Sequence, residues 1–379
     1  MTILSHKILL QPKPQQEKWL IEQCGYERWC YNQMLTSFKR GLSNGIWWDK
    51  FTLDKDLRHN KPEWANPRYA NGLTVARDNL SSAIRAWLND KQKSNRFPTF
   101  KSKKDKIACH FEVNASVKVK HRSIKLPKLG WVRMRNPLRF DGKLVGNASI
   151  SYDGRRWWIS LTVDTQTEPQ IKEGDNVIGV DVGIKSMAFT SDGVSYENPT
   201  PLKENLLQLR KIDKSISRSK NTHGHNKHSN RRDKLYTIRR RLHENITNIR
   251  KDTHRQAASA ITKRADVVCI ETLNVKGMVK NRKLARALSD VGLGGLLQEL
   301  AWQCKKRGVR LIEADMFFPS SKTCSGCGAI KQNLMLSERE YVCGECGLIV
   351  DRDLNAALNL KGQGLSLIRG ETVRPALAG

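Results

Sequence analysis

The segment VIGVDVGIK, residues 177–185, is an almost unbroken apolar run that contains one carboxylate, Asp181. Apolar runs of this kind are typical of central strands in a sheet with both faces covered. Because side chains alternate along a strand, Asp181 shares a face with Gly179 and Gly183. A carboxylate in such a place is costly unless a cation or another partner offsets its charge. The segment therefore predicts a central strand with a functional acid, whose flanking glycines leave room for a metal ion and a phosphate.

Strands alternate with helices in the part of the chain that follows this segment. ADVVCIETLNV (265–275) and VRLIEAD (309–315) have the apolar pattern of strands. Helical patterns lie before and between them, and a last helix begins at about Asp353. Alternation of this kind favours an α/β layer with some parallel strand pairing.

The N-terminal part of the chain has different periodicities. Residues 3–11 have the pattern of a single strand, and apolar residues fall at helical spacing over about 15–91. Over 105–165 the period changes to two, and Asp153-Gly154 between alternating flanks is a strong hairpin signal. We therefore expect a helical region followed by a β-barrel or sandwich.

The charge balance indicates a polyanionic partner. The 379 residues include 67 Lys and Arg against 37 Asp and Glu, a net charge of +30. Between Lys203 and Arg264 there are 18 basic and 5 acidic residues, so the predicted helices there have strongly positive faces. Nucleic acid is the expected partner. The sequence has no 18-residue apolar run and no signal-peptide pattern, so we expect an intracellular protein without a membrane partner.

Four of the nine cysteines have regular spacing. Two Cys-x2-Cys pairs are separated by 15 residues, and a glycine follows each pair; the cysteines are Cys324, Cys327, Cys343 and Cys346. Thiolates at this spacing bind a structural Zn²⁺ ion, and four of them leave no open coordination position. The other five cysteines have the surroundings of small buried hydrophobes. The histidine-bearing segment 221–230 is rich in Gly, Asn and Ser, which favours a flexible loop over a metal site.

Two further acids complete a set with Asp181. Glu271 closes the apolar strand that begins at Ala265, and Asp351 or Asp353 begins the last helix. Three carboxylates from two strands and a helix can hold two Mg²⁺ ions about 3.5–4 Å apart, as in two-metal phosphodiester hydrolysis. Taken singly, each acid also fits a structural role, as a turn-facing residue, an ion-pair partner or a helix cap.

Four segments near the C-terminus resemble one known family. They are GVDVGIK (179–185), IETLNVKGM (270–278), FFPSSKTCSGCG (317–328) and CGLIVDRDLNAALN (346–359). In this order they resemble the TnpB proteins encoded by insertion sequences, which are small relatives of the type V CRISPR effectors. FPTFK and KLPKLGWV extend the likeness upstream, so it covers most of the chain, and the helical part matches in pattern only.

The resemblance implies α/β structure together with a β-barrel and an α-helical lobe. It implies a RuvC nuclease domain of RNase H-like fold with an inserted four-cysteine zinc finger, an N-terminal wedge barrel of oligonucleotide-binding type and a helical recognition domain. The expected bounds are 1–12 and 96–170 for the wedge barrel, 13–95 for the recognition domain, 171–321 and 351–365 for the RuvC domain, 322–350 for the zinc finger and 366–379 for a mobile tail.

The family's activity is RNA-guided cleavage of DNA. The resemblance implies a Mg²⁺-dependent endonuclease whose guide RNA comes from the end of its element, and which cuts double-stranded target DNA beside a short transposon-adjacent motif. Carried over by motif, the catalytic and Mg²⁺-binding acids are Asp181, Glu271 and Asp353, with Asp351 as the alternative for the third position. Asn355 is a candidate for a supporting role only. The resemblance also implies a prokaryotic, cytoplasmic and nucleoid-associated protein.

Two other functions fit the same motifs. A transposase could join DNA ends with the same fold and acids, and a tightly bound RNA distinguishes the guided nuclease from it. A regulator could occupy nucleic acid without cutting, and Asp181→Ala would leave that function intact. The sequence leaves open the guide RNA, the adjacent motif and the residues that recognise it, the cleavage pattern and the oligomeric state.

Overall fold

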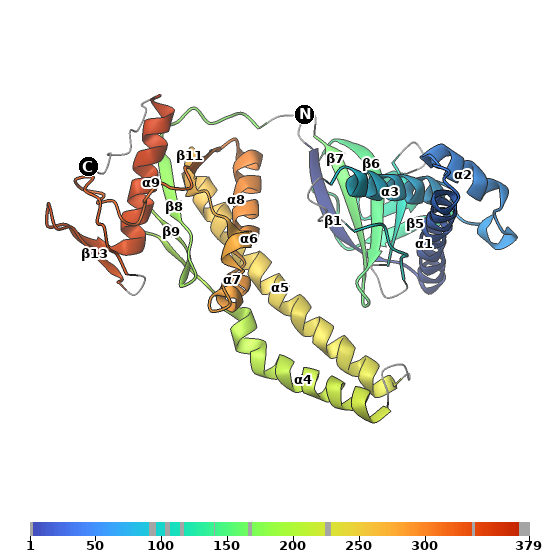
Figure 1. Ribbon diagram of the computed structural model, residues 1–379. Coiled ribbons are helices and arrows are strands. Elements are labelled where there is room, and N and C mark those ends of the chain that lie inside the picture. The colour runs from blue at the N-terminus through green and yellow to red at the C-terminus, as the bar shows by residue number, and fades with distance from the viewer. Residues whose placement is uncertain are drawn as a thin grey trace. The chain divides into compact units, whose positions relative to one another are not determined.

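The fold is described from a computed structural model, which covers residues 3–90, 96–102, 107–113, 117–139, 141–165, 169–223, 229–335 and 338–370. The chain forms two compact units, Met1–Glu168 and Pro169–Gly379. Each unit has its own sheet and its own helices (Figure 1). None of the described helices is both long enough and apolar enough to span a membrane.

Helices of the first unit pack around an aromatic core. They are α1 (Pro14–Ser43), α2 (Lys50–His59), the 3-10 helix η1 (Glu63–Ala65) and α3 (Asn71–Leu88). The core contains Tyr26, Leu35, Phe38, Leu57 and Leu80, which come from all three α-helices. The apolar spacing over 15–91 correctly predicts this helical region, except at 91–95, which lie outside the described residues.

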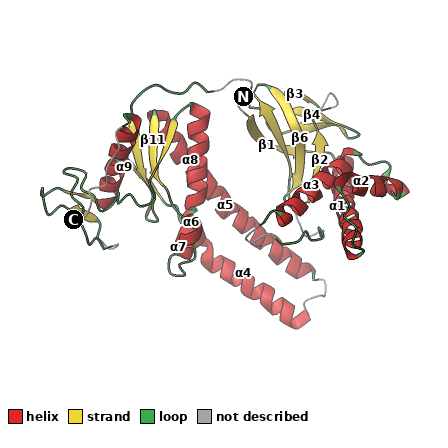
Figure 2. Cartoon of the chain, turned by 45° about the horizontal axis from the view of Figure 1, so that its top comes forward, coloured by secondary structure: helices red, strands yellow, loops and turns green. Residues whose placement is uncertain are grey.

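The first unit also contains a seven-stranded antiparallel sheet in the order β2-β6-β7-β1-β5-β4-β3 (Figure 2). Strand β1, the first in the chain, lies inside the sheet between β7 and β5. The hairpin predicted at Asp153-Gly154 joins β6 to β7. The strands are β1 (Ile3–Gln11), β2 (Ile107–Glu112), β3 (Lys118–Lys120), β4 (Ser123–Leu126), β5 (Gly130–Met134), β6 (Lys143–Tyr152) and β7 (Trp157–Asp164).

The expectation of a closed barrel is wrong for the described residues of this sheet. Strands β2 and β3 are its two edges and do not pair with each other. The reason lies at the free edge of β2, where the His110 backbone N–H donates to Glu27 Oε1 of α1 at 2.6 Å. The Glu27 side chain also contacts the His110 ring, 2.9 Å from Nδ1. A helix side chain therefore takes one backbone donor of the edge that a closing strand would pair with.

The second unit contains a five-stranded sheet in the order β10-β9-β8-β11-β12. Strand β8 is central, as its apolar run predicts, and the expected parallel pairing is confirmed for β8 with β11 and β11 with β12. The carboxyl ends of these three strands therefore meet at one edge of the sheet. The strands are β8 (Val177–Asp181), β9 (Ser186–Thr190), β10 (Ser195–Glu197), β11 (Val267–Glu271) and β12 (Arg310–Ala314).

Helices cover both faces of this sheet. One face packs against α5, α7 and α8 through a core that includes Ile178, Val180 and Val268. The other face packs against α9 through Val177, Val267 and Leu360. Figure 1 shows α9 on one side of β8 and α8 on the other. The helices are α4 (Pro201–His223), α5 (Asn230–Arg264), α6 (Val275–Met278), α7 (Ala285–Val291), α8 (Leu293–Arg307) and α9 (Arg352–Ile368).

The last helix is longer than expected. Helix α9 runs to Ile368, whose side chain is partly buried against the core on the α9 face. The sequence predicts a mobile tail from residue 366, but residues 366–368 belong to helix α9, where an apolar contact of Ile368 keeps the last turn in place. Residues 371–379 lie outside the described residues, as do residues 224–228 of the histidine-bearing segment 221–230.

A carboxylate from a distant part of the chain caps helix α4. The Asp290 carboxylate accepts hydrogen bonds from the backbone N–H groups of Leu202 (2.8 Å) and Lys203 (2.9 Å), in the first turn of α4. The Asp290 backbone carbonyl accepts a bond from Arg250 Nε of α5 at 2.8 Å. Asp290 is buried, with 4% of its surface exposed, so these contacts are shielded from water. One residue of α7 thus fixes the start of α4 against α5.

We predict that Asp290→Ala destabilises the second unit by about 2 kcal/mol, because it leaves two helix N–H groups of α4 without their acceptor. Thermal or denaturant unfolding measures this change. The matched control is Asp213→Ala, which removes an exposed carboxylate paired with Arg239 on the same helix pair and should change the free energy of unfolding by less than about 1 kcal/mol. Equal effects of the two substitutions would contradict the capping role.

Candidate functional site

Helix α9 approaches strand β8 closely at Gly179. A Cβ atom at this position would lie 2.0 Å from the carbonyl oxygen of Ala357 and 2.4 Å from the backbone nitrogen of Lys361. Helix backbone therefore takes the space beside Gly179, and the expectation that this glycine leaves room for a metal ion and a phosphate is wrong. The close approach instead brings the first turn of α9 to the end of β8. Gly183, the other flanking glycine, does line a cavity.

Asp181, Glu271 and Asp353 line one cavity of about 320 Å³ at the carboxyl edge of the parallel strands. Asp181 ends β8, Glu271 ends β11, and Asp353 lies in the first turn of α9. The structure thus brings together the three acids that the sequence singles out, from segments more than 80 residues apart in the chain. The rest of the wall combines basic and apolar side chains, including Lys185, Lys322, Leu334, Met335, Arg339 and Arg352.

The surroundings of Asp181 disfavour its charged form. Its side chain opens into the cavity but is otherwise enclosed by protein, and this burial raises the pKa of Asp181 well above the ordinary value of 3.8. The nearby carboxylates of Glu271 and Asp353 raise the pKa further, and the guanidinium of Arg352 opposes them. Three acids gathered in this way favour a bound cation, which would offset their mutual repulsion.

A buried serine contacts the second acid. Ser320 Oγ donates a hydrogen bond to Glu271 Oε1, and only 2% of the Ser320 surface is exposed. The Ser320 carbonyl oxygen accepts a bond from Asn359 Nδ2 of α9 at 2.7 Å. Ser320 therefore orients the Glu271 carboxylate and is itself fixed by the helix that carries Asp353. Sequence reasoning missed this residue, because a serine in a loop carries no signal of its partner.

The two aspartates of the DRD segment have different positions. Asp351 is the N-cap of α9, and its Oδ1 atom accepts the backbone N–H groups of Asp353 (2.8 Å) and Leu354 (3.1 Å). It does not line the cavity. Asp353 does line it, and its Oδ1 atom lies 3.2 Å from Arg352 Nη2. The helix-cap role therefore belongs to Asp351, and the cavity position to Asp353.

Asn355 supports the cysteine region. It is fully buried, its Oδ1 atom accepts the Ser325 N–H at 2.9 Å, and its Nδ2 atom donates to the Thr323 carbonyl at 2.7 Å. Asn359, one turn later, donates to the same carbonyl at 2.6 Å. These bonds attach the start of the cysteine region to α9. Asn355 therefore holds the residues on either side of Cys324, and these two hydrogen bonds go to the cysteine region and not to the acids.

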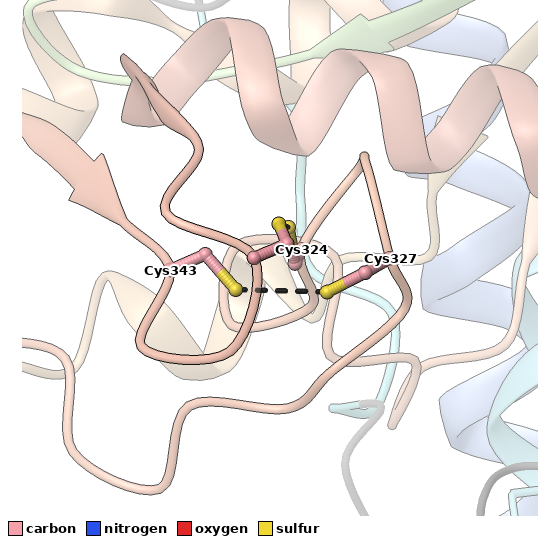
Figure 3. A group of neighbouring side chains, drawn as sticks. Cys324, Cys327 and Cys343 are labelled. Carbon is pink, nitrogen blue, oxygen red and sulfur yellow. Dashed lines mark hydrogen bonds between the residues drawn. The ribbon is translucent and has the colours of Figure 1, made fainter.

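The sulfur atoms of Cys324, Cys327, Cys343 and Cys346 lie within 4.8 Å of one another. Two of the separations, Cys324–Cys346 and Cys327–Cys343, are 3.6 Å. A tetrahedral Zn²⁺ ion with Zn–S bonds of about 2.3 Å requires sulfur separations of about 3.8 Å. The four thiols form no disulfide, and in Figure 3 Cys327 and Cys343 point toward each other from two turns. The donor set and its spacing therefore fit a zinc ion.

Two tight turns and a short hairpin shape this region. Gly328 and Gly347, which follow the cysteine pairs, have φ values of 79° and 73°, which favour glycine. Strands β13 (Glu340–Val342) and β14 (Ile349–Asp351) pair antiparallel beside the second cysteine pair. The region also supplies Leu334, Met335 and Arg339 to the wall of the acidic cavity.

The carboxylates are spread more widely than the cysteines. Within the described ranges, the four cysteines are the one group of three or more potential ligands whose atoms all lie within 4.8 Å of one another. The three acids therefore surround the cavity and do not converge on one point.

Similarity to known proteins decides the family. A putative RNA-guided DNA endonuclease of Streptomyces pristinaespiralis is 31% identical over 305 residues, which cover 78% of this chain and 74% of the relative. A TnpB-like protein of Acanthamoeba polyphaga mimivirus is 26% identical over 243 residues, which cover 60% of this chain and 45% of that protein. The chain belongs to the TnpB family.

Further matches cover other parts of this TnpB protein. A putative RNA-guided DNA endonuclease of Escherichia coli K12 is 26% identical over 389 residues, which cover 97% of this chain and 94% of the relative. Three family models match, described as "Probable transposase" (160–282), "Cas12f1-like, TNB domain" (294–360) and "Helix-turn-helix domain" (1–45). In the described part of 1–45 the structure has strand β1 and the single long helix α1, and no helix-turn-helix.

Solved structures similar to this TnpB protein include two effector complexes. A Cas12f1 complex with guide RNA and target DNA is 16% identical with a TM-score of 0.35, covering 95% of this chain and 99% of that one. CasPhi-2 bound to crRNA is 10% identical with a TM-score of 0.40, covering 96% and 98%. Both scores are low, and membership of the family rests on the sequence relatives.

We predict that Cys343→Ala removes zinc from the purified protein, because three thiolates cannot complete the tetrahedral set. Elemental analysis should find about one Zn²⁺ per chain in the unsubstituted protein and much less in the variant. Cys304→Ala, at a buried cysteine of α8 that is not part of the cluster, should keep its zinc even if it is less stable. Equal zinc loss in both variants would contradict the assignment of ligands.

We predict that Asp181→Asn raises the melting temperature of the zinc-loaded protein at neutral pH in buffer that contains no free divalent cation. Because the folded-state pKa of Asp181 is raised, stability is lost as the pH rises from the unfolded-state pKa through the folded-state pKa. The asparagine amide does not ionise, so the variant does not lose this stability. The difference in melting temperature between the two proteins should vanish below about pH 4, where the Asp181 carboxyl is protonated in both the folded and the unfolded state. Asp175→Asn, at an exposed aspartate, is the control and should show no such gain. A destabilised Asp181→Asn protein at pH 7 would contradict this account.

Proposed function

We propose that this protein is an RNA-guided DNA endonuclease of an insertion sequence, which cleaves target DNA beside a short transposon-adjacent motif by metal-dependent hydrolysis. The observation that carries the proposal is the cavity lined by Asp181, Glu271 and Asp353, in which burial and like charges raise the pKa of Asp181. Carboxylates under such mutual repulsion are suited to divalent cations. Two of its relatives, which it matches over most of their length, bear the name "Putative RNA-guided DNA endonuclease".

Asp181, Glu271 and Asp353 would hold the catalytic Mg²⁺ ions, since oxygen ligands are those that Mg²⁺ prefers. Bound there, Mg²⁺ would lower the pKa of water and stabilise the leaving oxygen of the phosphodiester. Ser320 orients the Glu271 carboxylate through its hydroxyl. Arg352 lies beside Asp353 and limits the repulsion among the acids.

Basic side chains around the acids would position the substrate backbone. Lys185, Lys322 and Arg339 line the same cavity as the carboxylates and come from three separate segments of the chain. Each can bind a phosphate next to the one that is cut, since charge-assisted hydrogen bonds to phosphate oxygens are strong. Arg339 comes from the cysteine region, so the zinc module would also contribute to substrate binding.

The domain assignment belongs to the same proposal. The five-stranded order with β8 in the centre supports an RNase H-like RuvC domain at 171–321 and 351–365, with the zinc finger at 322–350 inserted before α9. The wedge domain would comprise 1–12 and 96–170, and the recognition domain 13–95. The 18 basic against 5 acidic residues between Lys203 and Arg264 suit the phosphates of a guide RNA and its heteroduplex, which effectors recognise by shape.

A transposase remains the second candidate, because one matching family model is described as "Probable transposase". The two functions differ in their need for RNA. We expect a defined RNA to copurify with the protein and its removal to abolish cutting of a matching target. An RNA-free preparation that joins element ends would favour transposition.

We predict that Asp353→Asn lowers Mg²⁺-dependent cleavage by about 10³-fold or more, because a ligand charge is lost where metal stabilisation is worth several kcal/mol. The matched control is Asp351→Asn, two residues earlier, because asparagine caps helices as well as aspartate does. It should cleave within a few-fold of the unsubstituted protein. The assay uses the protein with its copurified RNA and a target designed from the sequence of that RNA. Equal losses in both variants, or a silent Asp353→Asn, would overturn the assignment.

A further inference from the structure

The loop between β12 and the cysteine region is attached to Glu271 at both ends. At its start, Ala314 is the register partner of Glu271 in the parallel pair of β11 and β12. The Ala314 carbonyl also accepts a hydrogen bond from Thr272 Oγ1 at 2.7 Å. At its end, Ser320 Oγ donates to the Glu271 carboxylate. The five residues 315–319 therefore form a short loop that begins and ends beside one of the three acids.

Backbone hydrogen bonds fix the conformation of this loop. The Asp315 side chain accepts the Phe317 N–H at 2.8 Å, and the Asp315 carbonyl accepts the Phe318 N–H at 3.0 Å. The Phe318 carbonyl accepts the Ser320 N–H at 2.9 Å. The Phe318 side chain packs against the core on the α9 face of the sheet. The position of the loop tip is therefore set by both hydrogen bonds and packing.

Phe317, at the tip, has an exposed aromatic ring. Its exposed fraction is 87%, the highest of the exposed large hydrophobic residues among those described, and the neighbouring Met316 is 54% exposed. Successive Cα atoms are about 3.8 Å apart, so the Cα atom of Phe317 lies within about 11 Å of those of Ala314 and Ser320. The backbone of Phe317 is thus held a short distance along the chain from Ser320, which contacts Glu271, and from Ser321 and Lys322, which line the acidic cavity. A ring exposed in this way adds almost no buried apolar surface to the folded chain. Binding a partner would bury that surface.

The chemistry of the neighbourhood indicates what that partner is. Lys185, Lys322 and Arg339 line the cavity and attract phosphates. A single-stranded nucleic acid presents both phosphates and base faces, and a base stacks on an aromatic ring whatever its sequence. A second copy of the chain fits less well, because one phenylalanine offers at most about 250 Å² and a stable interface needs about 800 Å² from each partner.

Building on the proposed nuclease function, we infer that Phe317 is a stacking platform for a base of the strand that enters the acidic cavity. The ring holds the nucleobase while the basic side chains hold the backbone, and together they set the position of the phosphate at the acids. Phe317 is thus a positioning residue, which touches the substrate a short distance from the reacting atoms. Because stacking needs only a π face, the subsite should accept all four bases.

Fluorescence of 2-aminopurine tests the stacking directly and without cleavage. Full-length protein is mixed with a series of single-stranded 12-mer oligodeoxynucleotides that carry 2-aminopurine at successive positions, with Ca²⁺ in place of Mg²⁺. We expect protein-dependent quenching in the unsubstituted protein, its loss in Phe317→Ala and Phe317→Leu, and its return in Phe317→Trp. Leucine keeps an apolar side chain and lacks the ring face, so it separates stacking from simple contact.

Cleavage of the guided target gives the second measurement. Phe317→Ala should lower kcat/KM by about 5- to 150-fold, the loss expected for one stacked base, and Phe317→Trp should restore it. Ile171→Ala, at another exposed apolar residue (68%), is the matched control and should leave both quenching and cleavage unchanged. These substitutions should leave the fold intact, because 87% of the Phe317 surface is exposed.

The outcomes separate this inference from the proposed function. If Asp181→Ala abolishes cleavage and keeps the quenching that depends on Phe317, both stand. If quenching depends on Phe317 and no cleavage is found, the nuclease proposal fails and the stacking site stands. Quenching that is identical in Phe317→Ala, or lost equally in Phe317→Trp, overturns the stacking platform. A change in oligomeric state without a change in quenching also overturns it and assigns the ring to self-association.

Discussion

Helix α9 can pack directly on strand β8 only because residue 179 has no side chain. A Cβ atom there would lie 2.0 Å from the Ala357 carbonyl oxygen, so any other amino acid would separate the helix from the strand. On the helix itself, Gly364 lies two turns after Ala357 and also allows a close approach to the sheet. A Cβ atom at Gly364 would lie 2.9 Å from the Val177 side chain and 3.0 Å from that of Cys269. The two contacts fix the distance and the axial position of the helix. Asp353 reaches the acidic cavity as a consequence of this registration.

The same registration connects the cysteine region to the acids. Asn355 and Asn359 lie one turn apart on α9 and hold the carbonyl groups of Ser320 and Thr323, just before the first cysteine. Ser320 in turn donates to Glu271. The four-cysteine insertion therefore does not separate β12 from α9, because the helix binds the segment that leads into the insertion. A shift of α9 along the sheet would displace Asp353 directly and the Glu271 carboxylate through Asn359 and Ser320.

The sequence predicts those features of the fold and the site that depend on residues within one short segment. The apolar run around Asp181 identifies the central strand, and the cysteine spacing identifies the cluster, since both signals lie within one segment. The cap on α4 by Asp290 and the bond from Ser320 to Glu271 join residues 87 and 49 positions apart, and neither segment reveals its partner. The open edge of the first sheet has the same origin, because Glu27 acts on a strand 83 residues later. The expectation for Gly179 is wrong for the same reason, because the sequence shows that this residue has no side chain and does not show which helix fills the space.

The burial of Asp181 and the repulsion among the three carboxylates lower the stability of the fold at one edge of the sheet. In a chain of net charge +30, opposite charges are abundant, and Arg352 together with the Ser320 hydroxyl offsets part of the repulsion. Burial first, and the neighbouring carboxylates second, raise the pKa of Asp181, so its charged form stays disfavoured. A cation bound among the acids would offset the remaining repulsion between their charges. The carboxylates that favour metal binding therefore also lower the stability of the fold when no metal is bound. The apolar strand residues before Asp181 and Glu271 are almost fully buried, so the core that carries the acids is continuous and the cost stays at the strand ends.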